Sequence, residues 1–182
     1  GFKNRENYQR LKEDPGYELI EEDWEVRNGY AIFKKKAAKL PLHIFTIVLN
    51  GMPFIKHHIE EFKKLDCEWH WHIIEGVADL KKDTAWSLKN GATIPPEFHS
   101  KGISNDGTAA YLNELARANP KNVTVYRKIS GEFWDGKIEM INCILPGINS
   151  EAVLFQVDSD ELWTADQIQR LTTLFQENPS KT

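Results

Sequence analysis

Two aspartates of the tripeptide Asp158-Ser159-Asp160 have the residue type and spacing of a metal site. They directly follow an apolar run, and a spacing of two predicts that an extended backbone points both carboxylates to one side. Such a pair can share a hard divalent cation through oxygen, and that cation takes its remaining ligands from water and phosphate oxygens. Because like charges close together repel unless a cation lies between them, we favour a metal site that binds a diphosphate over a solvated turn.

The segments that must position this pair alternate between strand-like and helix-like patterns. Apolar, β-branched runs predict strands, and residues recurring at helical spacing predict the helices between them. This alternation predicts an α/β fold, a single Rossmann-like domain with a mostly parallel central sheet flanked by helices. The predicted strands are His43–Leu49, Glu68–Glu75, Val123–Tyr126 and Ala152–Val157.

Several features of the later segments are specific enough to test. The run Ala152–Val157 is nearly continuous in apolar residues, as in a strand covered on both faces. Ile138, Ile141 and Leu145 share one face of a predicted helix. Thr164 and Gln167 have the spacing of a capping box and predict the start of the last helix.

In an open parallel sheet, ligands bind beyond the carboxyl ends of the strands. Three predicted strand ends carry polar or flexible residues, and we expect them to lie near one another. They are Asn50-Gly51, Glu75-Gly76 and Asp158-Ser159-Asp160.

The N-terminal part of the chain differs in character from the rest. Residues 1–40 are charged, with scattered aromatic residues and a lysine-rich end, and we interpret them as an irregular N-terminal arm. The lysine run is typical of a solvated helix face. Residues 41–182 then form the folded domain.

Composition narrows the class of protein and the compartment. The chain has 182 residues, 41% of them hydrophobic, which fits one domain with an ordinary core. A formal net charge of -4 without a clustered basic patch argues against a nucleic-acid or anionic-membrane binder. Cys67 and Cys143 are far apart, which suits reduced thiols. We therefore expect a soluble, cytoplasmic protein without a membrane span.

Four segments in order resemble the GT-A glycosyltransferases, close to the large family 2 type. The resemblance spans about Leu42 to Phe175 and rests on four motifs. They are Ile47–Ile55, Ser104–Thr108, Gly136–Asn142 and Leu154–Trp163.

The resemblance implies a glycosyltransferase that uses Mn²⁺ or Mg²⁺ and a nucleotide-sugar donor, commonly a UDP-sugar, and that inverts the anomeric carbon. It implies that the metal assists departure of the diphosphate as a Lewis acid. Roles carry over to eight positions of this chain. Leu49 and Asn50 match the strand end near the donor base, and Glu75 matches the acidic residue that contacts uracil. Asp106 matches the Asp-Gly turn, and Lys137 and Asn142 match the segment that approaches the diphosphate. Asp158 and Asp160 match the metal-binding pair.

The chain also departs from the family pattern. Glu75-Gly76-Val77 replaces the usual aspartate and Gly-Ser turn, and a loop of about thirty residues precedes Asp106, which is longer than most connections. The residues after Glu161 suffice for one helix but not for the usual acceptor half, which holds the general base. The domain is minimal or truncated, and no catalytic base is assigned. The acceptor is unknown.

Other functions compete with transfer. The first is a nucleotide-sugar binding module that lacks transfer activity. The second is a haloacid dehalogenase-type phosphatase, which also carries an Asp-x-Asp after a strand. The third is a nucleotidyltransferase, which would share the sheet but needs a glycine-rich phosphate loop. A zinc cluster built from His57, His58, His70, His72 and Cys67 is the competing metal site.

Overall fold

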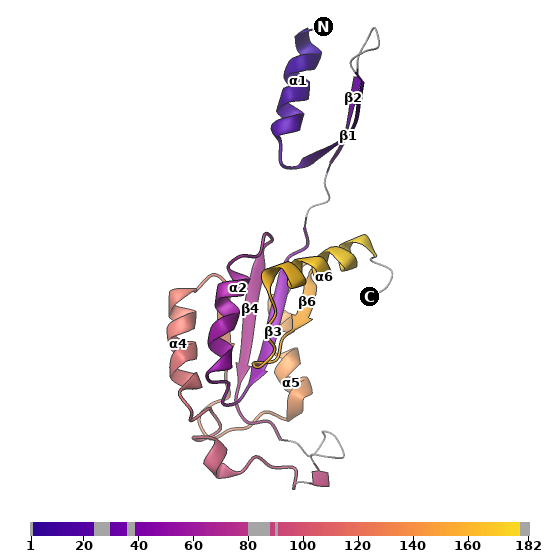
Figure 1. The fold of residues 1–182 in the computed structure, drawn as a ribbon. Helices are drawn as coiled ribbons and strands as arrows, with labels where there is room; N and C mark the ends of the chain where they lie inside the picture. Colours follow the sequence, from indigo (N-terminus) through magenta and orange to yellow (C-terminus); the bar gives the residue numbers. More distant parts are fainter. Residues whose placement is uncertain (1, 24–29, 36–38, 80–87, 90, 179–182) are drawn as a thin grey trace. The chain divides into compact units, whose positions relative to one another are not determined.

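The computed structural model describes residues 2–23, 30–35, 39–79, 88–89 and 91–178. The chain divides into two compact units, Gly1–Lys39 and Leu40–Thr182 (Figure 1). The first unit has regular secondary structure, so the expectation of an irregular arm is wrong. Each unit is described by itself below.

The first unit consists of a helix and a two-stranded antiparallel sheet. Helix α1 spans Phe2–Glu13, strand β1 spans Tyr17–Asp23 and strand β2 spans Tyr30–Lys35. The Tyr8 ring of α1 lies 5.8 Å from the Phe33 ring of β2, which places the helix against the hairpin. The Tyr8 and Phe33 rings therefore contact each other within this unit, and Lys34 belongs to a strand instead of a helix face.

The second unit contains a four-stranded parallel sheet in the order β5-β4-β3-β6. Strand β3 spans Leu42–Val48, β4 Trp69–Glu75, β5 Val123–Tyr126 and β6 Val153–Gln156. The parallel sheet with helices on both faces confirms the α/β class and is consistent with a Rossmann-like fold.

Most of the helices cover one face of the sheet, where the larger hydrophobic core lies (Figure 1). They are the 3-10 turn η1 (Phe54–His57), α2 (His58–Phe62), α4 (Thr108–Ala118) and α6 (Ala165–Glu177). A 3-10 turn η2 (Pro96–Phe98) precedes α4. Helix α6 begins with the capping box predicted for Thr164 and Gln167.

The opposite face carries a smaller core beneath α5 (Gly136–Asn142) and the 3-10 turn η3 (Leu145–Gly147). Met140 and Ile144 are the buried residues of this segment, whereas Ile138 is 73% exposed. The expected face of Ile138, Ile141 and Leu145 is therefore wrong. The α-helix ends at Asn142. Met140 and Ile144, which are four residues apart, pack against the sheet instead.

Strand β6 is an edge strand, so only one of its sides pairs with a neighbour. Leu154 is 47% exposed, which contradicts the expectation of a strand covered on both faces. Val153 pairs with Leu42, and Gln156 pairs with Phe45 near the carboxyl end of β3. Val48 of β3 is level with Glu75 of β4. The carboxyl ends of β3, β4 and β6 thus meet at one edge of the sheet.

Candidate functional site

The loop after β3 is held by side chains from the segment Ser104–Thr108. Three successive backbone N–H groups each donate to one of these side chains. Asn50 N donates to Ser104 Oγ at 3.0 Å, Gly51 N to Thr108 Oγ1 at 2.9 Å and Met52 N to Asp106 Oδ2 at 3.0 Å. Sequence reasoning selected Asn50 and Asp106 separately, and the structure brings them into one network.

Asp106 uses both carboxylate oxygens in this network. Its Oδ1 accepts from Thr108 N at 2.9 Å, at the start of α4. Although burial acts to raise the pKa of Asp106, hydrogen bonds from Thr108 and Met52 hold that pKa below its usual value. Asp106 is thus an ionised anchor between the loop and the helix.

Asn50 is the centre of a second set of contacts. Its backbone is left-handed, with φ of 58°, a conformation that asparagine tolerates better than most residues. Its Oδ1 accepts from Asn105 N at 2.9 Å, and its Nδ2 donates to the carbonyl of Phe98 at 2.6 Å. The neighbouring Leu49 is half-buried. Asn50 thereby joins the end of β3 to the long loop before α4.

Glu75 occupies a different place from the one expected for a base contact. Its side chain is fully buried, with Oε1 accepting from Ser104 N at 3.3 Å and Oε2 paired with Arg127 Nε. Arg127 also donates to Asn113 Oδ1 at 2.6 Å, which ties the pair to α4. The sequence analysis did not select Arg127. Arg127 directly follows β5, so the expectation that ligands bind beyond the carboxyl ends of strands, which selected Glu75, could have selected it too.

The acidic tripeptide after β6 is part of a tight turn. Glu161 N donates to the Asp158 carbonyl at 3.0 Å, and the Glu161 carboxylate accepts from Asp158 N at 3.2 Å. The expectation of an extended backbone here is wrong, because residues two apart in a turn do not share a face by strand alternation. Both Asp158 and Asp160 are exposed, and Asp158 Oδ1 accepts from Gln156 Nε2 at 3.0 Å.

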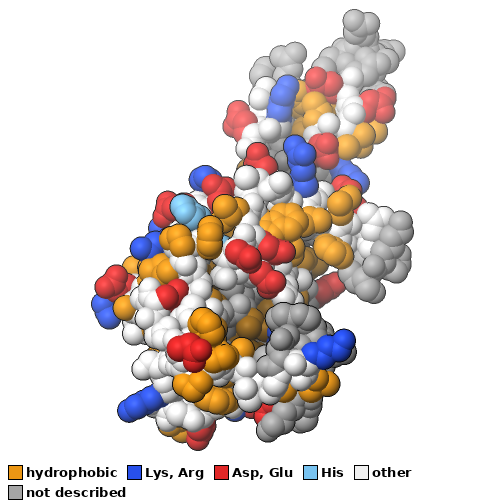
Figure 2. Space-filling view, turned by 60° about the horizontal axis from the view of Figure 1, so that its bottom comes forward, with side chains coloured by type: hydrophobic (Ala, Val, Ile, Leu, Met, Phe, Trp, Pro, Cys, Tyr) orange, Lys and Arg blue, Asp and Glu red, His pale blue; other side chains and the backbone are white. Residues whose placement is uncertain are grey.

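The acidic turn lies against the loop that follows β3. Gly51 is buried, and a Cβ placed on it would lie 3.3 Å from Ser159 Cβ. Figure 2, which brings the carboxyl edge forward, shows acidic side chains among hydrophobic ones on this face. The ends of β3 and β6 therefore form one continuous surface.

The two residues selected on α5 lie at different distances from this edge. The helix begins near the end of β4, where Trp134 N donates to the Val77 carbonyl at 2.9 Å. Lys137 is exposed in the first turn of α5, close to that point. Asn142 is the last residue of α5, about 7.5 Å further along the helix axis at 1.5 Å per residue. The structure brings Lys137 toward the edge and leaves Asn142 away from it.

The described ranges contain no group of three or more His, Cys, Asp or Glu residues able to hold a metal ion. The histidines expected to form a zinc cluster lie on opposite faces of the sheet. His58 stacks on Trp71 with ring centroids 5.6 Å apart, whereas His72 contacts Tyr126 on the α5 side. Asp158 and Asp160 carry carboxylate oxygens, the donor type that a hard cation prefers, and the turn does not align them by strand alternation.

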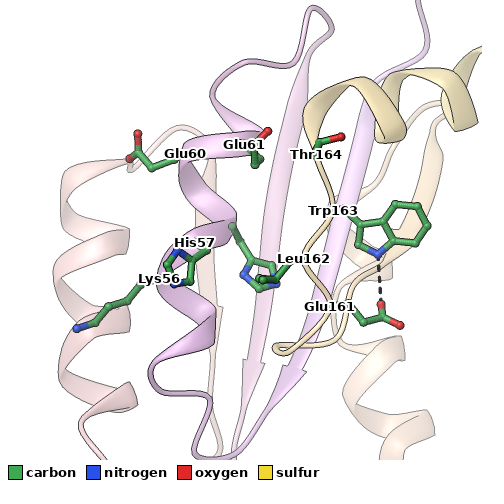
Figure 3. Close-up of a pocket in the computed structure, with 9 residues that line it drawn as sticks. Lys56, His57, Glu60, Glu61, Glu161, Leu162, Trp163 and Thr164 are labelled. Carbon is green, nitrogen blue, oxygen red and sulfur yellow. Dashed lines mark hydrogen bonds between the residues drawn. The ribbon is translucent and has the colours of Figure 1, made fainter.

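A cavity of about 310 Å³ lies between α2 and the segment that follows the acidic turn (Figure 3). Figure 3 shows Lys56 and Glu60 on the α2 side and Leu162 on the other. His58 also lines this cavity and is 4% exposed. Burial lowers the pKa of His58, while a hydrogen bond to the Asp158 carbonyl acts in the opposite direction.

Comparison with known proteins leaves the family open. No protein-family model, no curated protein and no solved structure matches this chain. In the residues that the structure describes, no helix is both long enough and apolar enough to cross a bilayer. The functional argument therefore rests on the geometry of the carboxyl edge.

Proposed function

We propose that this chain is a metal-dependent glycosyltransferase that takes a sugar from a nucleotide diphosphate donor, a UDP-sugar, with inversion. The observation that carries the proposal is the position of the acidic turn. It lies beside Gly51, where the ends of β3 and β6 meet.

This position is the topological switch point of the sheet. The chain continues from β3 to β4 and β5 on one side, whereas β6 pairs with the other side of β3, so the strand order reverses at β3. Open α/β sheets bind ligands beyond the carboxyl ends of the strands, at the point where the strand order reverses. The loop Asn50-Gly51 and the turn Asp158–Glu161 lie side by side at this edge.

Each residue at this edge has a part in the proposed reaction. Asp158 and Asp160 would hold Mn²⁺ or Mg²⁺ together with diphosphate oxygens, and a bound metal supplies Lewis-acid stabilisation of the leaving diphosphate. Lys137 contributes a positive charge near the same edge. Asn50 and Asp106 keep the loop after β3 in place.

Glu75 takes a positioning role in this proposal instead of the base contact that the resemblance implied. Its carboxylate binds Ser104 N, and Ser104 Oγ in turn binds Asn50 N. Glu75 thus supports the Asn50 loop through Ser104.

Calorimetric titration of the whole chain with UDP in the presence and absence of Mn²⁺ tests the proposal. We expect metal-dependent binding that weakens by about tenfold or more in Asp160→Asn, as loss of a metal ligand does. Asp166→Asn, an exposed aspartate in the first turn of α6, is the matched control and should bind as the unaltered chain does. Equal binding by Asp160→Asn rejects the metal role.

Donor hydrolysis separates an enzyme from a binding module. Mass spectrometry of nucleotide-sugars incubated with the chain and Mn²⁺ should detect release of UDP. Metal-dependent binding without any release would instead support the alternative, a nucleotide-sugar binding module that lacks transfer activity.

A further inference from the structure

His58 connects the core of the second unit to the acidic turn. It is the first residue of α2 and is almost completely buried. Its ring lies flat on Trp71, with an interplanar angle of 10°, and meets the edge of Phe62 at 78°. Trp71 is fixed in turn, because its Nε1 donates to Thr46 Oγ1 at 3.0 Å. The imidazole is therefore held in one orientation by two strands and a helix.

The hydrogen bond of this imidazole points at the turn. Nε2 of His58 lies 3.2 Å from the carbonyl oxygen of Asp158. A carbonyl oxygen only accepts, so Nε2 carries the proton and donates. The same oxygen accepts from Glu161 N at 3.0 Å. The first peptide of the turn is thus held both by its own chain and by a side chain a hundred residues earlier.

We propose that His58 is a positioning residue that holds the turn Asp158–Glu161 in the orientation needed for its carboxylates to bind metal. The hydrogen bond fixes the Asp158 peptide, and the directions of the Asp158 and Asp160 side chains follow from that peptide. The role in metal binding rests on the proposed function, whereas the hold on the turn does not.

The alternative is a histidine that only fills space in the core. Two substitutions separate the two roles. His58→Phe keeps a ring against Trp71 but has no donor, whereas His58→Gln keeps a donor near the position of Nε2 but has no ring. A packing role predicts that the glutamine is the more harmful change, and a positioning role predicts that it is the less harmful one.

The experiment uses the whole chain and two measurements. Hydrogen exchange of peptides covering residues 157–163 reports on the turn without any ligand, and titration with UDP and Mn²⁺ reports on the site. We expect His58→Phe to speed exchange in the turn by about fivefold, the effect of one lost hydrogen bond. We also expect it to weaken metal-dependent binding by about tenfold, as for other residues that orient metal ligands. His58→Gln should restore most of both.

His57→Phe is the control, because His57 is exposed and adjacent in sequence. It should leave both measurements unchanged. Unaltered exchange in His58→Phe, or a glutamine variant as impaired as the phenylalanine one, overturns the inference. If the unaltered chain binds no UDP with Mn²⁺, the proposed function fails, and the exchange data alone still decide whether His58 holds the turn.

Discussion

The Glu75 carboxylate and the Arg127 guanidinium form an ion pair behind the carboxyl edge of the sheet. The Glu75 side chain is fully buried, whereas the Arg127 side chain is 25% exposed. A buried pair of this kind is costly to break from one side, because the remaining charge and its hydrogen-bond partners lose their compensation.

We expect Glu75→Ala to lower the free energy of unfolding by about 3 kcal/mol, because Arg127 and Ser104 N both lose their acceptor. The double variant Glu75→Leu with Arg127→Leu should lose clearly less than the two single variants together. Urea unfolding measures all of them. A loss below ~1 kcal/mol in Glu75→Ala would contradict the structural role assigned to this carboxylate.

Asn50 combines a left-handed backbone with two side-chain hydrogen bonds, and two substitutions separate these contributions. Asn50→Gly removes the whole side chain including the Cβ, whereas Asn50→Ala keeps the Cβ in a left-handed conformation that alanine tolerates poorly. We therefore expect Asn50→Ala to be less stable than Asn50→Gly by ~1 kcal/mol. Thermal melting of the two proteins measures the difference, and equal melting temperatures would show that the backbone strain is absent.

Gly76 must remain glycine for two reasons. Its φ is +135°, and a Cβ would lie 2.9 Å from the backbone carbonyl oxygen of Gly102. Gly76→Ala should therefore lower the free energy of unfolding by roughly 2 kcal/mol or more. Gly147→Ala is the control, because nothing lies within 4 Å of its added Cβ. Similar chemical denaturation curves for the two variants would be evidence against the crowded turn.

The histidines on the α5 side of the sheet predict a stability that depends on pH. Burial, with smaller contributions from the charges of His70 and His43, lowers the pKa of His72 from 6.5 to about 4. Tyr126 hydrogen bonds to the same ring, and Cys143 lies near Tyr126.

Below pH 6.5 the unfolded chain binds a proton that folded His72 does not, so folding stability falls as the pH drops toward 4. At about 1.4 kcal/mol per pKa unit, the loss between pH 7 and pH 5 is on the order of 2 kcal/mol. Urea midpoints at these two pH values measure it. His72→Gln should show a smaller difference between the two pH values, and an unchanged difference would assign the pH dependence to other groups.

Local patterns were enough to predict most elements of the second unit. Alternating strand and helix patterns predicted β3, β4, β5 and α6, because each buries a face whose period is visible in the sequence. The pattern did not show that β6 lies at the edge of the sheet, since strand order depends on contacts between distant segments. The N-terminal hairpin was missed because its strands are rich in charge.

The sequence was enough to select residues of the candidate site by their type and position, but not to predict which side chains contact them. The strand-end rule selected Asn50 and Glu75, yet the partners that hold them are far away in sequence. Arg127 and His58 gave no motif of their own, because a buried ion pair or a single hydrogen bond has no local signature. The turn at Asp158 was misjudged as extended because an acidic tripeptide suits both conformations.

The pairing of β6 with β3 joins the last strand of the second unit to its first. Contacts between segments so far apart in sequence raise the contact order, and closing such a loop is slow. The Asn50 loop follows β3, and the acidic turn follows β6. These two parts of the candidate site therefore meet only when the second unit completes its folding, and a chain released before β6 would carry the Asn50 loop without the acidic turn beside it.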